Sequence, residues 1–135
     1  MSKLKRRALT ATVLSLVAVG ALSTAAGATR TVRIHSKVSI ANHHGLHFAG
    51  RVTSPNHACV EQRKVVLFRV IENGPDQVLE RDITSAQGSW SVEVSGFAGI
   101  GMSHFYAKVK RRSEGTAGTI YVCQADRSRT IELGG

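Results

Sequence analysis

Histidines are the residues of this sequence whose type and spacing come closest to a chemical site. His43, His44 and His47 form an H-H-x-x-H run, and His35 and His57 lie near it in sequence. Imidazole nitrogens bind zinc, copper or nickel. However, the run lies at the expected start of a strand, where positions three apart face opposite sides, and no acidic residue is close in sequence. We therefore predict a solvated polar loop and no metal site.

A second candidate is the basic run Lys108, Lys110, Arg111 and Arg112, which lies on and just after a predicted strand. In an extended chain, Lys108 and Lys110 share one face. Such a ridge can contact a nucleic acid, a teichoic acid or an acidic glycan. Alternatively, lysines on an exposed edge strand prevent edge-to-edge aggregation. No aromatic residues alternate with the charges, so we expect no specific nucleic-acid binding.

The glycine-rich segment 96–101 superficially resembles a phosphate-binding loop, but its glycine spacing is reversed and a strand follows it. We predict a connection between sheets, in which Phe97 and Ile100 are candidate contacts for a partner. Common hydrolase, zinc-protease and nucleotide-binding motifs are absent, and the nine carboxylates are scattered. We therefore predict no catalytic residues, no cofactor and no enzymatic activity. The sequence does not exclude a Ser-His-Asp site whose residues come from different strands, because such sites are recognised by their geometry and not by sequence spacing.

The first 28 residues determine how the rest of the chain is interpreted. Four basic residues within residues 1–7 precede an apolar run that ends near Leu22, and Ala26-Gly27-Ala28 follows in an A-x-A pattern. These are the three parts of a secretory signal peptide. We predict a helical leader, cleaved after about Ala28. The alternative is an uncleaved anchor, but the apolar run is shorter than the roughly 20 residues that span a bilayer.

Export changes the interpretation of the two cysteines. In a reducing cytosol, Cys59 and Cys123 could be metal ligands or buried thiols, but in an oxidising compartment they most simply form one disulfide. That bridge would close a loop of about 64 residues and contribute at most about 4 kcal/mol in the chain-entropy model.

Removal of the leader leaves a net charge of +5, because four of the 18 Lys and Arg lie in it and none of the nine Asp and Glu do.

Residues 29–135 show period-two alternation of apolar residues and no sustained helical periodicity. Short strands with turn clusters about every ten residues are typical of an all-β sandwich or barrel. We predict a single all-β domain, a seven- to eight-stranded antiparallel β-sandwich of Ig-like or prealbumin-like type, with its core module at about 46–133. The predicted strands are 32–40, 46–52, 63–71, 77–84, 89–95, 103–110, 119–123 and 129–133. The predicted core is Phe48, Val52, Val65, Leu67, Phe68, Val70, Trp90, Val92, Val94, Phe105, Val109, Ile120, Val122 and Ile131.

Several of these segments occur in a recognisable order. The strand Phe48-Ala49-Gly50-Arg51-Val52 comes first, residues 84–92 place a glycine just before the strand that Trp90 opens, and Phe105-Tyr106-Ala107-Lys108-Val109 follows. Cys123 and a closing strand around Ile131 complete the series. This order resembles bacterial extracellular β-sandwich modules of the carboxypeptidase-regulatory-like, or transthyretin-like, type. The resemblance implies a sandwich without catalytic residues of its own, of a kind that usually accompanies another domain.

Together these features predict a secreted, non-catalytic protein with a binding or structural role in the cell envelope or the extracellular space. We expect it to be extracellular or periplasmic, monomeric, and free of the membrane after cleavage. Its expected partner is an envelope polymer or protein. The alternative is a secreted inhibitor or immunity-type protein that blocks an enzyme through one loop.

Overall fold

The structure, a computed structural model, describes residues 27–96 and 102–133, and its regular elements are strands apart from one 3-10 turn. The predicted all-β class is therefore confirmed. In chain order the elements are β1 (Arg30–Ile34), β2 (Lys37–Val38), β3 (Ala41–His44), β4 (His47–Thr53), η1 (His57–Cys59), β5 (Lys64–Arg69), β6 (Gln77–Ile83), β7 (Ser89–Glu93), β8 (Ser103–Val109), β9 (Arg112–Thr116), β10 (Thr119–Cys123), β11 (Asp126–Arg127) and β12 (Ile131–Leu133).

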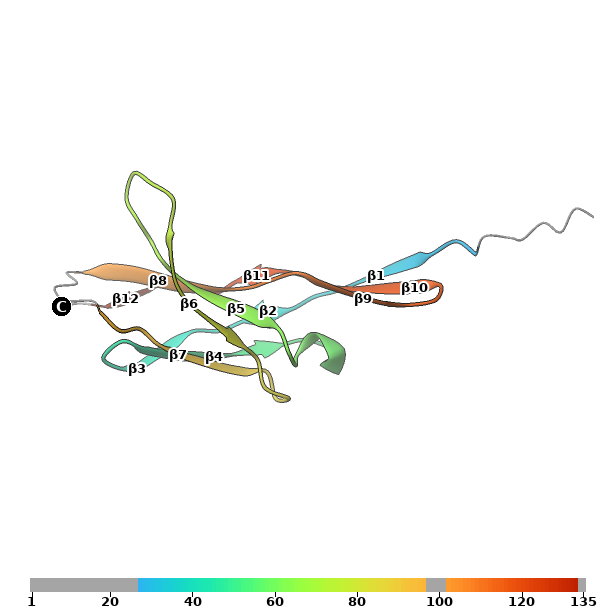
Figure 1. Cartoon of the computed structure of the whole chain (residues 1–135), viewed down its shortest axis with the longest axis horizontal. Helices are drawn as coiled ribbons and strands as arrows, with labels where there is room; N and C mark the ends of the chain where they lie inside the picture. The colour runs from blue at the N-terminus through green and yellow to red at the C-terminus, as the bar shows by residue number, and fades with distance from the viewer. Residues whose placement is uncertain (1–26, 97–101, 134–135) are drawn as a thin grey trace, which may run out of the picture.

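Two antiparallel sheets form the sandwich, and Figure 1 shows them one above the other. In one sheet, β5 lies between β6 and β8, and the far edge of β8 pairs with β11 and β12. In the other sheet, β4 is central, with β7 on one edge and β2 followed by β3 on the other. The predicted β-sandwich is thus the architecture of the described chain.

A third sheet extends from one end of the sandwich and is called the arm below. It consists of β1, β10 and β9 in that order (Figure 1), and β1 runs parallel to β10. The sequence predicted only antiparallel strands and a single strand at 32–40. That segment is instead divided between β1 in the arm and β2 in the sandwich, and residues 112–116, expected in a loop, form β9.

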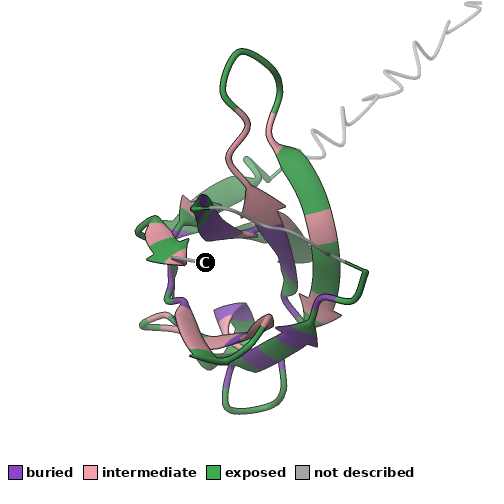
Figure 2. Ribbon diagram, turned by 90° about the vertical axis from the view of Figure 1, so that its left-hand side faces the viewer, coloured by how far each residue is buried: buried purple, intermediate pink, exposed green. Residues whose placement is uncertain are grey.

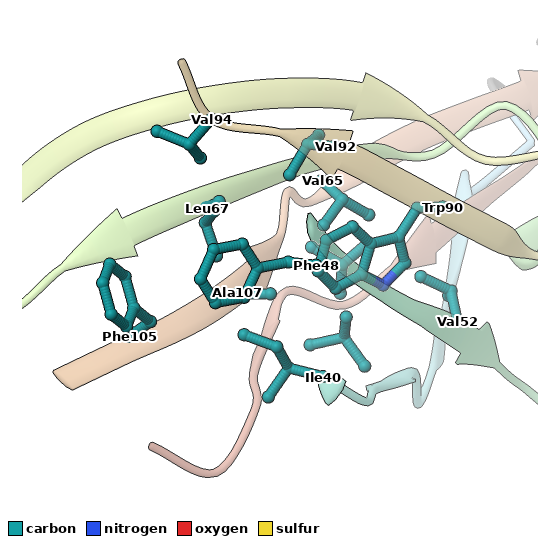
Figure 3. Close-up of a cluster of buried hydrophobic side chains, with 12 residues drawn as sticks. Ile40, Phe48, Val52, Val65, Leu67, Trp90, Val92, Val94, Phe105 and Ala107 are labelled. Carbon is teal, nitrogen blue, oxygen red and sulfur yellow. The ribbon is translucent and has the colours of Figure 1, made fainter. Parts of the chain in front are cut away.

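The core lies between the two facing sheets, where the buried side chains of strands from both sheets meet (Figures 2 and 3). It also includes Val38 and Ile40, which precede the predicted module at 46–133. Phe68, Val70 and Ile131 are only half-buried. Ile120 is 36% exposed because β10 belongs to the arm, outside the sandwich. The predicted core residues that are buried are Phe48, Val52, Val65, Leu67, Trp90, Val92, Val94, Phe105, Val109 and Val122.

The disulfide that the sequence predicted is present, and it joins the arm to the sandwich. Cys59, in η1, is bonded to Cys123, at the end of β10, and their Cα atoms are 5.3 Å apart. Both cysteines are buried beside Ile34, and Val32 packs against them. The bridge therefore holds a small apolar cluster where the arm begins.

Arg63 supports the same junction from inside. Its guanidinium donates to the Ser36 hydroxyl at 2.9 Å and to the carbonyls of Cys59, Lys110 and Gln124 at 2.7, 2.8 and 3.1 Å. Ser36, Lys110 and Gln124 are the places where the chain crosses between the sandwich and the arm. The side chain is fully buried, and this burial lowers the pKa of Arg63, with a smaller effect from nearby Arg112. A single buried cation thus ties all three crossings together.

Candidate functional site

The outer face of the β6–β5–β8–β11 sheet carries a row of cations, and we call it the basic face. Val65 and Val109 point into the core, so their neighbours on β5 and β8 point outward. In the register, Arg81, Val66, Lys108 and Arg127 lie side by side across four strands. Three cations from three strands therefore stand in one line.

Lys64 and Lys110 extend this row toward the arm. The backbone N–H of Lys110 donates to the Lys64 carbonyl at 2.9 Å, which places the two residues next to each other. Beyond them is a hollow of about 350 Å³ whose lining includes Lys64, Lys110 and Arg111, together with Ile83. Ile83 is 52% exposed. Arg112 and Gln62 complete the lining, so the hollow combines four basic residues with one apolar side chain that is open to solvent.

Aromatic rings hold two cations of the basic face in place. Phe68 and Tyr106 stack with centroids 5.1 Å apart and planes at 9°. The Arg127 guanidinium lies 3.6 Å from the centre of the Tyr106 ring, and the Lys108 ammonium lies 5.5 Å from that of Phe68. Cation–π contacts of this kind are favourable, so Lys108 and Arg127 are fixed charges on the face.

One carboxylate, Asp76, interacts with this group. It accepts a 2.6 Å hydrogen bond from the Tyr106 hydroxyl and a 3.1 Å bond from the backbone N–H of Ile71. These bonds, with smaller effects from Arg127 and Lys108, lower the pKa of Asp76. Burial, followed by the hydrogen bond to Asp76, raises the pKa of Tyr106. Asp76 is therefore ionised at neutral pH and offsets part of the positive charge.

The basic run identified in the sequence is divided by the fold. Lys108 and Lys110 lie on the basic face, and Arg111 lines its hollow. Arg112 also lines the hollow, but its guanidinium donates to the carbonyls of Ala58, Glu61 and Gln62. It also pairs with Glu114 at 3.4 Å. Arg112 therefore stabilises the turn after η1. Three cations of the basic face were not predicted from the sequence, namely Lys64, Arg81 and Arg127.

The candidate histidines lie at the opposite sheet. His43 and His44 belong to β3, and His47 begins β4, so the two strands form a tight hairpin. The expectation that positions 44 and 47 face opposite sides is wrong, because the chain turns between them and the two residues are cross-strand partners. His43 also borders a shallow hollow of about 650 Å³ over this sheet. The fold thus brings the rings of His43 and His44 into contact with that of His47.

Two further predicted features fall outside the described residues. Phe97 and Ile100, the candidate partner loop, lie in the segment 97–101, and most of the leader lies in residues 1–26. Both stay predictions. Within residues 27–96 and 102–133, no helix has the length and apolar character needed to span a membrane.

Comparisons of this chain with family models, curated proteins and solved structures find no match. The resemblance to transthyretin-like modules therefore stays a prediction.

Proposed function

We propose that this chain is a secreted, non-catalytic binding protein whose basic face holds an anionic polymer of the cell envelope or the extracellular space. The observation that carries the proposal is the row of cations on one sheet face. Lys108 and Arg127 are direct cross-strand partners, and like charges in that position are destabilising. Asp76 offsets them only in part. An anionic ligand bound across the row would relieve this repulsion.

The hollow beside Lys64 and Lys110 supports a ligand of this type. Arg111 and Arg112 add two further basic residues to its lining, and exposed Ile83 offers an apolar contact. A phosphate or carboxylate group placed among these cations would be attracted by all of them, and the remaining row would follow a repeating anionic chain. Of the two rings on the described basic face, Tyr106 is buried and Phe68 is half-buried. This burial argues against base stacking, so a teichoic acid or a uronate polymer fits better than a nucleic acid.

Export is part of the proposal. The Cys59–Cys123 disulfide is of a kind that persists in oxidising compartments, and residues 1–28 have the composition of a signal peptide. Intact mass of the exported protein, before and after reduction, tests both points. We expect a chain that begins at Thr29 and contains one disulfide; two free thiols or a retained leader would contradict this part.

Binding is tested with two triple variants of equal net charge. The first removes three of the four cations that line the hollow, Lys64→Gln, Lys110→Gln and Arg111→Gln, and keeps Arg112, which stabilises the turn after η1. The control removes three exposed cations elsewhere, Arg30→Gln, Lys37→Gln and Arg51→Gln. Affinity for purified teichoic acid and for heparin is measured at physiological and at raised salt. We expect the first variant to lose about tenfold or more in affinity and to show a shallower salt dependence, and the control to stay near the parent.

Equal losses in both triple variants would show attraction to net charge alone and would contradict a defined basic face. Loss of all binding by the parent protein at physiological salt would overturn the proposal. Binding seen only at low salt would reflect nonspecific long-range attraction, which salt screens. Thermal unfolding of each variant confirms that its fold is intact.

A further inference from the structure

The β3–β4 hairpin brings three histidine rings together at its tip. A bulge lies between Asn42 and His44, so two residues of β3 face one residue of β4. The amide of Asn42 donates to the carbonyls of Gly45 and His47 at 2.9 and 3.1 Å, which fixes the turn. As a result, both His43 and His44 lie against the ring of His47.

The distances between these rings suit shared binding of one ion. The centroid of the His47 ring is 5.4 Å from that of His44 and 5.7 Å from that of His43. Two imidazoles bound to one tetrahedral zinc ion at about 2.1 Å have centroids about 5 Å apart. As the side chains stand, no three His, Cys, Asp or Glu groups of the described chain form a metal-holding arrangement. His43 and His44 are exposed, so their side chains have room to rotate and bring a ring nitrogen toward that of His47.

The ring of His47 provides a second observation that points to a ligand. Its Nδ1 atom is buried and has no hydrogen-bond partner among the described residues. A buried nitrogen without a partner is costly, and a metal ion is one group that would satisfy it. The register also places Glu93 of β7 directly across from His47. A carboxylate therefore stands on the neighbouring strand, although it is far away in sequence.

We propose that this hairpin is a surface site for a divalent first-row transition metal, with His47 as the central ligand and His44 and His43 completing it. The imidazole set favours zinc, copper or nickel over magnesium or calcium, and Cu²⁺ should bind most tightly. The site lies on the sheet opposite the basic face, so it acts independently of the proposed polymer binding.

The test is titration of the full, disulfide-bonded chain with ZnCl₂ and separately with CuCl₂, followed by histidine ring resonances in NMR spectra. We expect Zn²⁺ to shift the resonances of His43, His44 and His47, and Cu²⁺ to broaden the same three. His35 and His57 serve as internal references, because neither lies in the hairpin.

Variants separate a defined site from scattered binding. We expect His47→Ala to weaken zinc binding by about tenfold or more, since loss even of an outer-shell partner has that effect. The matched control His57→Ala should bind zinc as the parent does. Trp90 fluorescence and metal-free thermal unfolding show whether His47→Ala still folds; if it does not, His44→Ala serves in its place. Unchanged histidine resonances in the parent, or equal losses in His47→Ala and His57→Ala, would overturn the proposal.

Discussion

Replacement of Arg63 by methionine is the most demanding test of how the arm is attached to the sandwich. Methionine fills similar volume without a charge, so the change removes the hydrogen bonds and leaves little cavity. The bonds to the Ser36 hydroxyl and the Cys59 carbonyl are buried, and those to Lys110 and Gln124 are partly buried. The first two acceptors therefore lose their partner out of reach of water, whereas water can replace the guanidinium at the other two.

The expected loss follows from those two buried acceptors. A buried polar group left without its partner costs about 1–3 kcal/mol, so the two together cost about 2–6 kcal/mol. Removing a buried charge returns part of this, because burial disfavours the charged form of Arg63. We expect a net loss of about 3 kcal/mol, a large share of the roughly 5–10 kcal/mol that stabilises a small domain. The melting temperature should fall by about 12–24 °C, at about 4–8 °C per kcal/mol.

Urea unfolding followed by tryptophan fluorescence measures this loss, because Trp90 is the only tryptophan and is buried. Arg63→Lys tests the geometry: one ammonium cannot reach four acceptors in different directions, so we expect it to be destabilised nearly as much. Arg81→Met, on an exposed position of β6, is the control and should stay within about 0.5 kcal/mol. A methionine variant at position 63 as stable as the parent would refute the reasoning, since burial of the charge would then outweigh its hydrogen bonds.

Three further predictions concern the turns, the disulfide and the pH dependence. Gly88→Ala should be strongly destabilising, because a Cβ there would clash with the Val52 carbonyl oxygen. Gly118 also has a positive φ but is surrounded by open space, so Gly118→Ala should cost only about 1 kcal/mol. Thermal unfolding of the two variants compares these losses. Reduction of the disulfide should lower the free energy of unfolding by up to about 4 kcal/mol. Denaturant unfolding with and without reductant measures this loss, and equal midpoints would contradict it. Tyr106→Phe should flatten the pH profile of stability at both ends. The lowered pKa of Asp76 gives stability above its unfolded pKa that is lost as pH falls through the folded value, and the raised pKa of Tyr106 gives stability below about pH 10 that is lost at higher pH. A profile identical to that of the parent would contradict this assignment.

Local pattern was sufficient for most of the sandwich. The alternation of Trp90 and Val92 with polar neighbours predicted a half-buried strand, and β7 has that burial pattern. The turn before it also follows the prediction: Gly88 has a φ of 81° and its carbonyl accepts from the Val52 N–H. These features depend only on the nearest residues and on which face is apolar, so the sequence contains them directly.

The candidate sites were predictable only in part, since each depends on neighbours from distant segments. Lys108 and Lys110 were recognised as sharing a face, but their partners Lys64 and Arg127 come from other strands. Arg63 looked like the polar start of a strand, because nothing local reveals that two distant carbonyls and a distant hydroxyl accept hydrogen bonds from it. Its position just before an unbroken apolar run is the only signal, and that signal equally fits a surface residue.

The sequence alone determined the strand class, the positions of most turns and the choice of cysteine partner, because period-two alternation is local and two cysteines allow only one pairing. The tertiary structure decided the rest. It separated the arm from the sandwich, paired β1 with β10 in parallel, and placed Arg63 at the three crossings. It also aligned cations from four strands and folded three histidines onto one hairpin. Register between distant strands sets these arrangements, and register is fixed by packing of the whole core rather than by any single segment.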